Sequence, residues 1–339
     1  MPLPFILGAA ALVAGVTGVG SGIHGASEMK SAKETMDAAE YLNKQNQDKF
    51  KKKDKATNKT MDKLGKLELN IMSDFSEFAD VIEKIQNRPE FKAFDKKGVK
   101  LPKYNKEELR EVSIGAGVIL GGLGGTAAGT AGGFAAAGAT TSAVMALGTA
   151  STGTAISSLS GAAATNAALA ALGGGAKGIG GGMALGSAVL SGATLGVGLL
   201  VGGVIFNKTG KKMSNQAEEA FDQVYESSKK VRKICNYLDD LKETAEEYTE
   251  SLEDTFEKYN ECFSIVRETV NNGKLDWWEF TQDEKNATEN SSSLVGLLYK
   301  MCKVNLVNVS ENEEEMNTIN KQQVNSVLND AYEVVNNLK

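Results

Sequence analysis

The side chains best suited to catalysis are scarce in this chain of 339 residues. Its one histidine, His24, lies within an apolar N-terminal stretch, so a Ser–His or Cys–His centre would have to use it. A metal site would have no second imidazole, and "NNGKLDWWEF" lacks the Asp and Asn ladder of a calcium loop. Paired carboxylates occur on charged helical segments, where we expect exposed faces. The sequence therefore predicts no enzyme, no metal site and no cofactor.

The cysteines also give no sign of a reactive or metal-binding site. Cys235, Cys262 and Cys302 are odd in number, far apart, and outside any CxxC pair. This pattern excludes a disulfide framework and disfavours zinc. We interpret the three thiols as small apolar residues that are buried in a reducing compartment.

Glycines can bind phosphate groups, but their spacing here does not fit. In "NKTGKKM", Lys212 follows Gly210 and Lys211 where a P-loop has Ser or Thr, and no glycine lies five residues before Gly210. Where G-x-G occurs, the third glycine of a dinucleotide-binding loop is replaced by Leu120, Leu185 or Val201. No strand pattern precedes these places, so we expect no nucleotide site.

The glycines instead recur at intervals of four. The residues that share this spacing are Gly117, Gly121, Gly125, Gly129 and Gly133, then Gly174, Gly178, Gly182 and Gly186, then the pair Gly192 and Gly196, and the pair Gly198 and Gly202. Residues four apart lie on one helix face, so each series forms a groove without side chains. A second helix can approach such a groove closely, which is the typical packing of helices in lipid.

Two other structures are conceivable for this apolar middle: a disordered linker and a soluble helical bundle. A disordered linker is disfavoured because Leu, Ile, Val, Met and Phe are interspersed among the small residues. Tight helix packing inside a soluble bundle stays open, although each glycine costs roughly 0.5–1 kcal/mol relative to alanine in a helix. Because the stretch is only weakly hydrophobic for its length, we expect conditional insertion: a soluble bundle first, and a bilayer later.

The elements that must position these glycines are helical. Few prolines and sparse aromatics favour an all-α fold, with long coiled-coil-like helices flanking a Gly/Ala-rich helical hairpin. The composition divides the chain into five parts: an apolar N-terminal helix (1–27), charged and amphipathic helices (28–112), the Gly/Ala-rich membrane-insertion hairpin (113–207), a long heptad helix (208–273) and C-terminal helices (274–339).

Periodicity defines the helices around the hairpin. One apolar face runs from Leu64 to Ile85, through Leu67, Ile71, Phe75, Phe78 and Ile82, and Pro89 is expected to end or interrupt it. Asn105 is a plausible N-cap for a helix that begins "NKEELREV". From Met213 to about Asn271, apolar residues alternate at three and four, and Gly273 ends this seam. Two further helical stretches contain Leu294, Leu297, Leu298 and Met301, and Ile319, Val324, Val327, Leu328, Tyr332, Val335 and Leu338.

Charge and three smaller features refine this picture. The formal net charge is −6 and acidic residues dominate after Met213, which argues against a nucleic-acid partner. The apolar N-terminus has no basic n-region, so a retained membrane or core segment is favoured over a cleaved signal. The basic run from Lys49 to Lys66 is read as a solvated helix face, with anionic headgroups as the alternative. Trp277 and Trp278 are read as packing under a loop, with membrane-interface anchors as the alternative.

The stretch "GTASTGTAISSLSGAAATNAALAALGGGAKGIGGGMALGSAVLSG", Gly148 to Gly192, resembles a recurrent Gly/Ala-rich bacterial segment, found behind starts similar to "LPFILGAAAL". Such proteins resemble bacterial relatives of the apolipoprotein L family over about the first two-thirds of the chain. The resemblance implies a helical protein with a membrane-insertion hairpin that forms ion-conducting pores or remodels membranes. By the same resemblance, 113–206 would be the insertion region.

These observations lead to a first hypothesis of a membrane-inserting protein that forms pores or remodels membranes through its glycine-zipper hairpin. The expected partners are a lipid bilayer, further copies of the chain in a homo-oligomer, and a coiled-coil protein. The expected location is at a membrane, with a soluble cytoplasmic form before insertion. The alternatives are a membrane-associated coiled-coil scaffold that recruits a protein without conductance, and a wholly soluble helical bundle.

Overall fold

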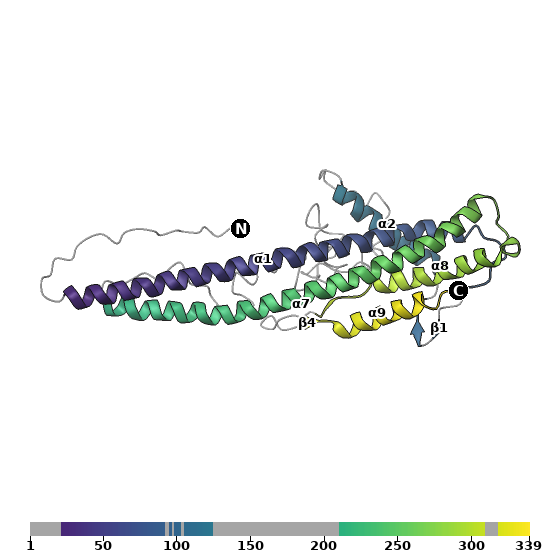
Figure 1. Cartoon of the computed structure of the whole chain (residues 1–339). Helices are drawn as coiled ribbons and strands as arrows, with labels where there is room; N and C mark the ends of the chain where they lie inside the picture. Colours follow the sequence, from purple (N-terminus) through teal and green to yellow (C-terminus); the bar gives the residue numbers. More distant parts are fainter. Residues whose placement is uncertain (1–21, 92–94, 97, 103–104, 125–209, 309–317) are drawn as a thin grey trace. The chain divides into compact units, whose positions relative to one another are not determined.

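In a computed structural model of the chain, the structure describes residues 22–91, 95–96, 98–102, 105–124, 210–308 and 318–339 (Figure 1). Of these residues, 81% are helical, which confirms the all-α fold class. The chain divides into two compact units, and the boundaries between them fall within two long helices. Unit 1 contains the described residues 22–54 and 210–239. Unit 2 contains 55–124 and 240–339, apart from the residues that the structure does not describe.

The helices are α1 (Gly22–Ile82), α2 (Lys106–Gly124), α7 (Gly210–Asn271), α8 (Gln282–Met301) and α9 (Lys321–Val335), and a short 3-10 helix, η2, spans Trp277–Glu279. Two antiparallel strand pairs join them. β1 (Asp95–Lys96) pairs with β2 (Val99–Lys100), and β3 (Val307–Asn308) pairs with β4 (Thr318–Ile319). Gly98 precedes β2 with φ +84°, a left-handed conformation that glycine adopts readily.

In unit 1, the first part of α1 lies parallel to the first part of α7. The Asn46 amide donates to the Ser228 hydroxyl at 2.6 Å, and Lys53 pairs with Asp239 at 2.7 Å. From the first contact to the second, the residue numbers increase in both α1 and α7, so the two helices are parallel. The buried apolar residues are mainly small or aliphatic: Ala32, Ala39, Ala217, Ala220, Val224, Ile234 and Leu238, together with Phe50.

In unit 2, α1 and α7 are again parallel, since Lys63 pairs with Glu253 at 3.0 Å and Glu77 with Arg267 at 3.2 Å. α8 runs antiparallel to both of them. The hydroxyl of Tyr248 on α7 donates to the carbonyl of Met301 at 2.8 Å, and the ring of Phe75 on α1 meets Tyr299 edge-on. α9 packs antiparallel along α8, with Lys300 and Asp330 2.6 Å apart (Figure 1).

An aromatic cluster fills the unit 2 core between α1 and α7. Phe78 is fully buried, with its ring 6.1 Å from that of Tyr259 and 5.5 Å from that of Phe263. Phe256 stacks on Tyr259 at 5.9 Å. These rings bury large apolar surfaces in preferred edge and offset arrangements. Through Phe78, this cluster connects α1 to α7 in unit 2.

The apolar seam predicted for α7 is buried at every position in its second part only. α7 ends at Asn271, and Gly273 follows in the left-handed conformation, with φ +83°. From Ile234 to Val270, every seam position is buried, whereas Phe221, Ser228 and Val231 are half-buried. A side-chain pattern of this kind does not by itself establish coiled-coil geometry. The coiled-coil detail therefore stays a prediction.

Two expectations about helix ends and faces are wrong. α1 ends at Ile82, seven residues before Pro89, because Gln86 leaves the helix to pair with the loop after α7. Its N–H donates to Leu275 at 2.8 Å, and its carbonyl accepts from Trp277 at 3.0 Å. The last helix begins at Lys321, which places Ile319 in β4. Its buried face is Val324, Val327, Ala331 and Val334, and Tyr332 is 66% exposed.

Candidate functional site

The helix that leads into the Gly/Ala-rich segment begins at a side-chain cap. The Asn105 side chain accepts a hydrogen bond from the backbone N–H of Glu108 at 3.2 Å, which confirms the predicted N-cap. Glu107 and Glu108 in the first turn place negative charge beside the unpaired N–H groups of the helix start. α2 then runs antiparallel to the end of α1. Its N-terminal part, 106–113, is called the base of α2 and lies on the unit 2 core.

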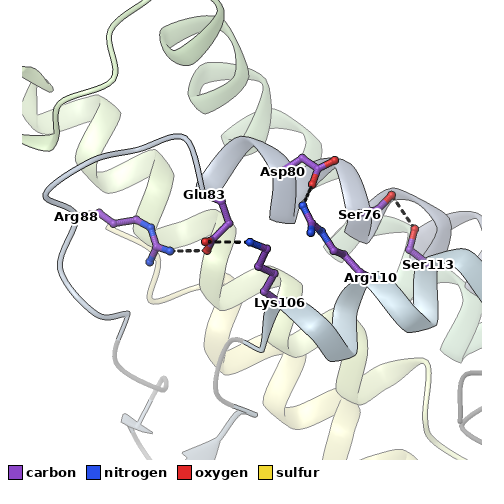
Figure 2. A network of polar contacts seen from close by, with 7 residues as sticks. All are labelled: Ser76, Asp80, Glu83, Arg88, Lys106, Arg110 and Ser113. Carbon is purple, nitrogen blue, oxygen red and sulfur yellow. Dashed lines mark hydrogen bonds and ion pairs between the residues drawn. The ribbon is translucent and has the colours of Figure 1, made fainter.

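Ion pairs fasten this base to α1 (Figure 2). Glu83, just beyond the end of α1, lies between two cations, with Arg88 at 2.6 Å and Lys106 at 3.4 Å. One turn further along α2, Arg110 pairs with Asp80. Each pair is partly exposed, so each contributes only about 0.2–1 kcal/mol to the docking of α2.

A buried serine continues the contact toward the C-terminal part of α2. The Ser113 hydroxyl donates to the backbone carbonyl of Ser73 at 2.5 Å and lies 2.9 Å from the Ser76 hydroxyl (Figure 2). Ser113 is only 5% exposed, so this bond satisfies a polar group that would otherwise be buried at a cost. The contact keeps the backbones of α1 and α2 close.

α8 holds the same base from the other side. The Tyr299 hydroxyl donates to the Glu108 carboxylate, and the Lys303 ammonium lies 3.3 Å from it and 3.9 Å from the Tyr299 ring centroid. The hydrogen bond from Tyr299, and then the Lys303 cation, lower the pKa of Glu108. Burial, and then the bond to Glu108, raise the pKa of Tyr299. The charged form of Glu108 is thus part of the α2–α8 contact.

A close backbone approach also fixes the segment before α2. A Cβ at Gly296 of α8 would lie 3.3 Å from the Pro102 carbonyl oxygen and 3.6 Å from the Leu101 Cβ. Glycine therefore allows α8 to pack against the connection between β2 and α2. The start of α2 is consequently positioned by α1, α8 and the preceding loop together.

The predicted glycine groove begins on the outward face of this anchored helix. Ile114 is 45% exposed, and a Cβ built at Gly117 would meet no described atom within 4 Å. Gly121 also belongs to α2. Gly117, the first glycine of the predicted series, therefore lies on a face of α2 that the described core does not cover.

The rest of the predicted glycine series lies beyond the end of α2. The glycines that lie outside the described residues are Gly125, Gly129, Gly133, Gly174, Gly178, Gly182, Gly186, Gly192, Gly196, Gly198 and Gly202. Their part in helix packing stays a prediction that rests on their spacing.

The contacts that anchor α2 were not predicted from the sequence. Asp80, Glu83, Tyr299 and Lys303 lie within or just beyond α1 and α8, in stretches of sequence that give no sign of a common site. A Lys-rich flank before the hairpin is visible as a composition, but its partners are not. Only folding brings residues such as Arg110 and Asp80 together.

Two lysines that could bind a ligand are ion-paired, and the cysteines that could react are free thiols. A groove of about 580 Å³ between α8 and the start of α9 contains Lys300 and Lys303, which pair with Asp330 and Glu108. Cys235 and Cys302 are buried and Cys262 is half-buried, all as free thiols. Within the part of the chain that the structure describes, no three His, Cys, Asp or Glu residues are placed to hold a metal ion.

The tryptophan pair and the basic run have separate outcomes. Trp277 is buried against Phe280, as the packing interpretation predicts, whereas Trp278 is 75% exposed. On α1, the apolar Phe50 and Met61 point inward, while the described lysines of the run are exposed or ion-paired, which fits a solvated face.

No helix within the described ranges has the length and apolar character needed to cross a bilayer.

No family model, curated protein or solved structure matches the chain.

Replacing Glu108 by glutamine is expected to loosen the base of α2. The variant loses the charge that Tyr299 and Lys303 hold, so amide exchange in 106–116 should rise about two- to tenfold, as for one or two exposed charge contacts. Because the folded pKa of Glu108 is lowered, its contribution is present above about pH 4.5 and lost as the pH falls through the folded pKa. Hydrogen-exchange mass spectrometry at pH 3.5 and 6.5 measures both effects.

Glu107→Gln is the matched control, because Glu107 is the exposed neighbour in the same turn. It should exchange like the wild type at both pH values. Equal exchange in Glu108→Gln and the wild type at pH 6.5 would show that this carboxylate does not hold α2.

Proposed function

We propose that this is a membrane-inserting helical protein that forms a pore or remodels a membrane through its Gly/Ala-rich segment, residues 113–207. The described helices of unit 2 serve as a body that holds the start of this segment before insertion. The observation that carries the proposal is the position of α2. It is anchored at its base by α1 and α8, and it turns the first glycine of the spaced series, Gly117, away from the described core.

The nature of the anchor supports conditional insertion. Several contacts between α2 and the body are partly exposed ion pairs, such as Arg110 with Asp80 and Lys106 with Glu83. Pairs of this kind are individually weak and screened by salt. A bilayer that receives the glycine groove can therefore compete with the body for α2. The resemblance to bacterial relatives of apolipoprotein L points to the same class of activity.

The proposal includes a location and partners. The protein is membrane-associated, preceded by a soluble cytoplasmic form, and its partner is the lipid bilayer. Several copies assemble in the membrane, because a glycine groove satisfies its packing only against a second helix. The second candidate function is a scaffold without conductance that recruits a coiled-coil protein partner. The long helices α1 and α7 favour it, since their outward faces carry many charged side chains.

Two measurements with the purified full-length protein decide between these functions. Leakage of a dye trapped in vesicles of phosphatidylcholine and phosphatidylglycerol is expected for the pore or remodelling activity. Flotation with the same vesicles without leakage is expected for the scaffold. Absence of both would contradict every membrane function and leave the soluble bundle. Resistance to salt and carbonate extraction from the protein's first appearance in the cell would contradict the conditional step.

A further inference from the structure

Glu68 of α1 occupies a core position in unit 2. Together with Glu68, the buried residues Met61, Leu64, Ile71 and Phe75 are spaced at alternating steps of three and four. Its side chain is fully buried, whereas the neighbouring Leu67 is half-buried. A carboxyl group thus lies on the buried face of α1, among apolar side chains.

The surroundings of Glu68 leave its carboxyl without a partner. Neither oxygen has a hydrogen-bond partner among the described residues. The titratable groups that face it are Tyr248 from α7 and Cys302 from α8. The Tyr248 hydroxyl already donates to Met301, and the Cys302 thiol lies 4.0 Å from the backbone carbonyl of Glu68 rather than from its carboxyl. A buried carboxylate in such a place would bear a large, uncompensated desolvation cost.

We propose that proton binding by Glu68 controls the packing of α1, α7 and α8 in unit 2. The core is packed with a neutral carboxyl group, and loss of the proton favours the opened core, in which water reaches the carboxylate. Burial raises the pKa of Glu68 well above its ordinary value, which agrees with the geometry. Burial, and then the nearby Glu68, raise the pKa values of Tyr248 and Cys302, so both groups stay neutral. A phenol or thiol has no positively charged form, so neither offers Glu68 a counter-charge.

The sign of the pH dependence follows from the raised pKa. Between the ordinary pKa, near 4.5, and the folded value, the folded state binds a proton that the unfolded state has lost. The stability of unit 2 is therefore highest at the acidic end of this window and falls as the pH rises. Glu108 acts in the opposite sense and at lower pH, so the two carboxyl groups can be told apart.

The position of Glu68 connects this core to the anchor of α2. Cys302 and Met301 at the end of α8 lie beside Glu68 and Tyr248, and Tyr299 and Lys303 from the same end hold Glu108. Opening of the core around Glu68 therefore displaces the end of α8 that fastens α2. We expect release of the α2 base to follow the same proton.

Urea unfolding of the full-length protein at pH 5.5, 6.5 and 7.5 tests the core. Both tryptophans of the chain belong to unit 2, so their fluorescence reports on this unit. The unfolding constant of the wild type should rise by up to about tenfold per pH unit, the limit for one proton. Glu68→Gln should lose this slope. The substitution changes only this carboxyl, so the difference in slope between the two proteins isolates Glu68.

Glu257→Gln, at an exposed carboxyl on α7, is the control and should keep the wild-type slope. If Glu68→Gln does not fold, Glu68→Leu provides the same comparison with an apolar core residue. A wild type whose stability does not fall above pH 5.5, or a slope that survives in the Glu68 variants, would overturn the proposal.

Hydrogen exchange in 106–116, corrected for intrinsic rates, tests the connection to α2 on the same samples. Exchange should accelerate between pH 5.5 and 7.5 in the wild type and not in Glu68→Gln. Equal acceleration in both would overturn the connection. Neither measurement involves a membrane, so its failure is distinct from failure of the proposed function.

Discussion

Replacing Gly125 and Gly129 together by leucine is expected to reduce dye release to the level of vesicles without protein. Both residues lie in the series that continues from Gly117 and Gly121 of α2. A leucine side chain fills the groove, so a second helix can no longer approach closely enough to gain van der Waals contact. The variant keeps or raises helix propensity and apolar character, because leucine is favoured over glycine in both respects. The loss would therefore report on packing.

The matched control is Gly125→Ala with Gly129→Ala. Alanine raises helix propensity in the same way, but it is a small residue that helix interfaces in lipid accept. We expect this variant to retain most of the release. Flotation of both variants separates a failure to bind from a failure to assemble. Undiminished release by the leucine variant would contradict a pore built on the glycine groove.

Phe78→Ala is expected to lower the free energy of unfolding of unit 2 by about 3–5 kcal/mol, as for other buried phenylalanines. The Phe78 ring is fully buried between α1 and α7, against Tyr259 and Phe263. Its removal leaves a cavity at the centre of the aromatic cluster, and rigid neighbouring rings can refill only part of it. Urea denaturation followed by tryptophan fluorescence measures the change.

Tyr332→Ala is the control for this prediction, because it also removes an aromatic ring but from an exposed position on α9. Its effect should stay within about 0.5 kcal/mol, as for most surface substitutions. A loss at Phe78 no larger than the loss at Tyr332 would show that the aromatic cluster does not stabilise unit 2.

Membrane activity and core stability place different demands on the same helices. Under the proposed function, the Gly/Ala-rich segment leaves the described helices to insert, whereas the aromatic core between α1 and α7 stays packed. The start of α2 is held by partly exposed ion pairs as well as by its buried residues Leu109 and Val112, whereas buried rings lie between α1 and α7. Salt should therefore weaken the docking of α2 more than it weakens the core.

The sequence by itself determined the elements whose signals are local. The seam from Ile234 to Val270 is buried as its periodicity predicts, because residues three and four apart must share one helix face. Asn105 caps α2 and Gly273 follows α7 in the left-handed conformation, because both roles depend on the backbone within a few residues. The glycine spacing is also local, but most of the series lies outside the described residues.

Only the tertiary structure decided which residues meet across the fold. Periodicity favoured Leu67 on the buried face of α1, yet Glu68 is the residue in the core, because the neighbouring helices select the face. α1 ends at Ile82 and not at Pro89, since the distant loop after α7 captures Gln86. The parallel course of α1 and α7, and the convergence of Asp80, Glu83 and Tyr299 on α2, depend on contacts between remote segments. Such contacts leave no periodic trace in one sequence, and they determine which carboxyl group is buried and which residues hold α2.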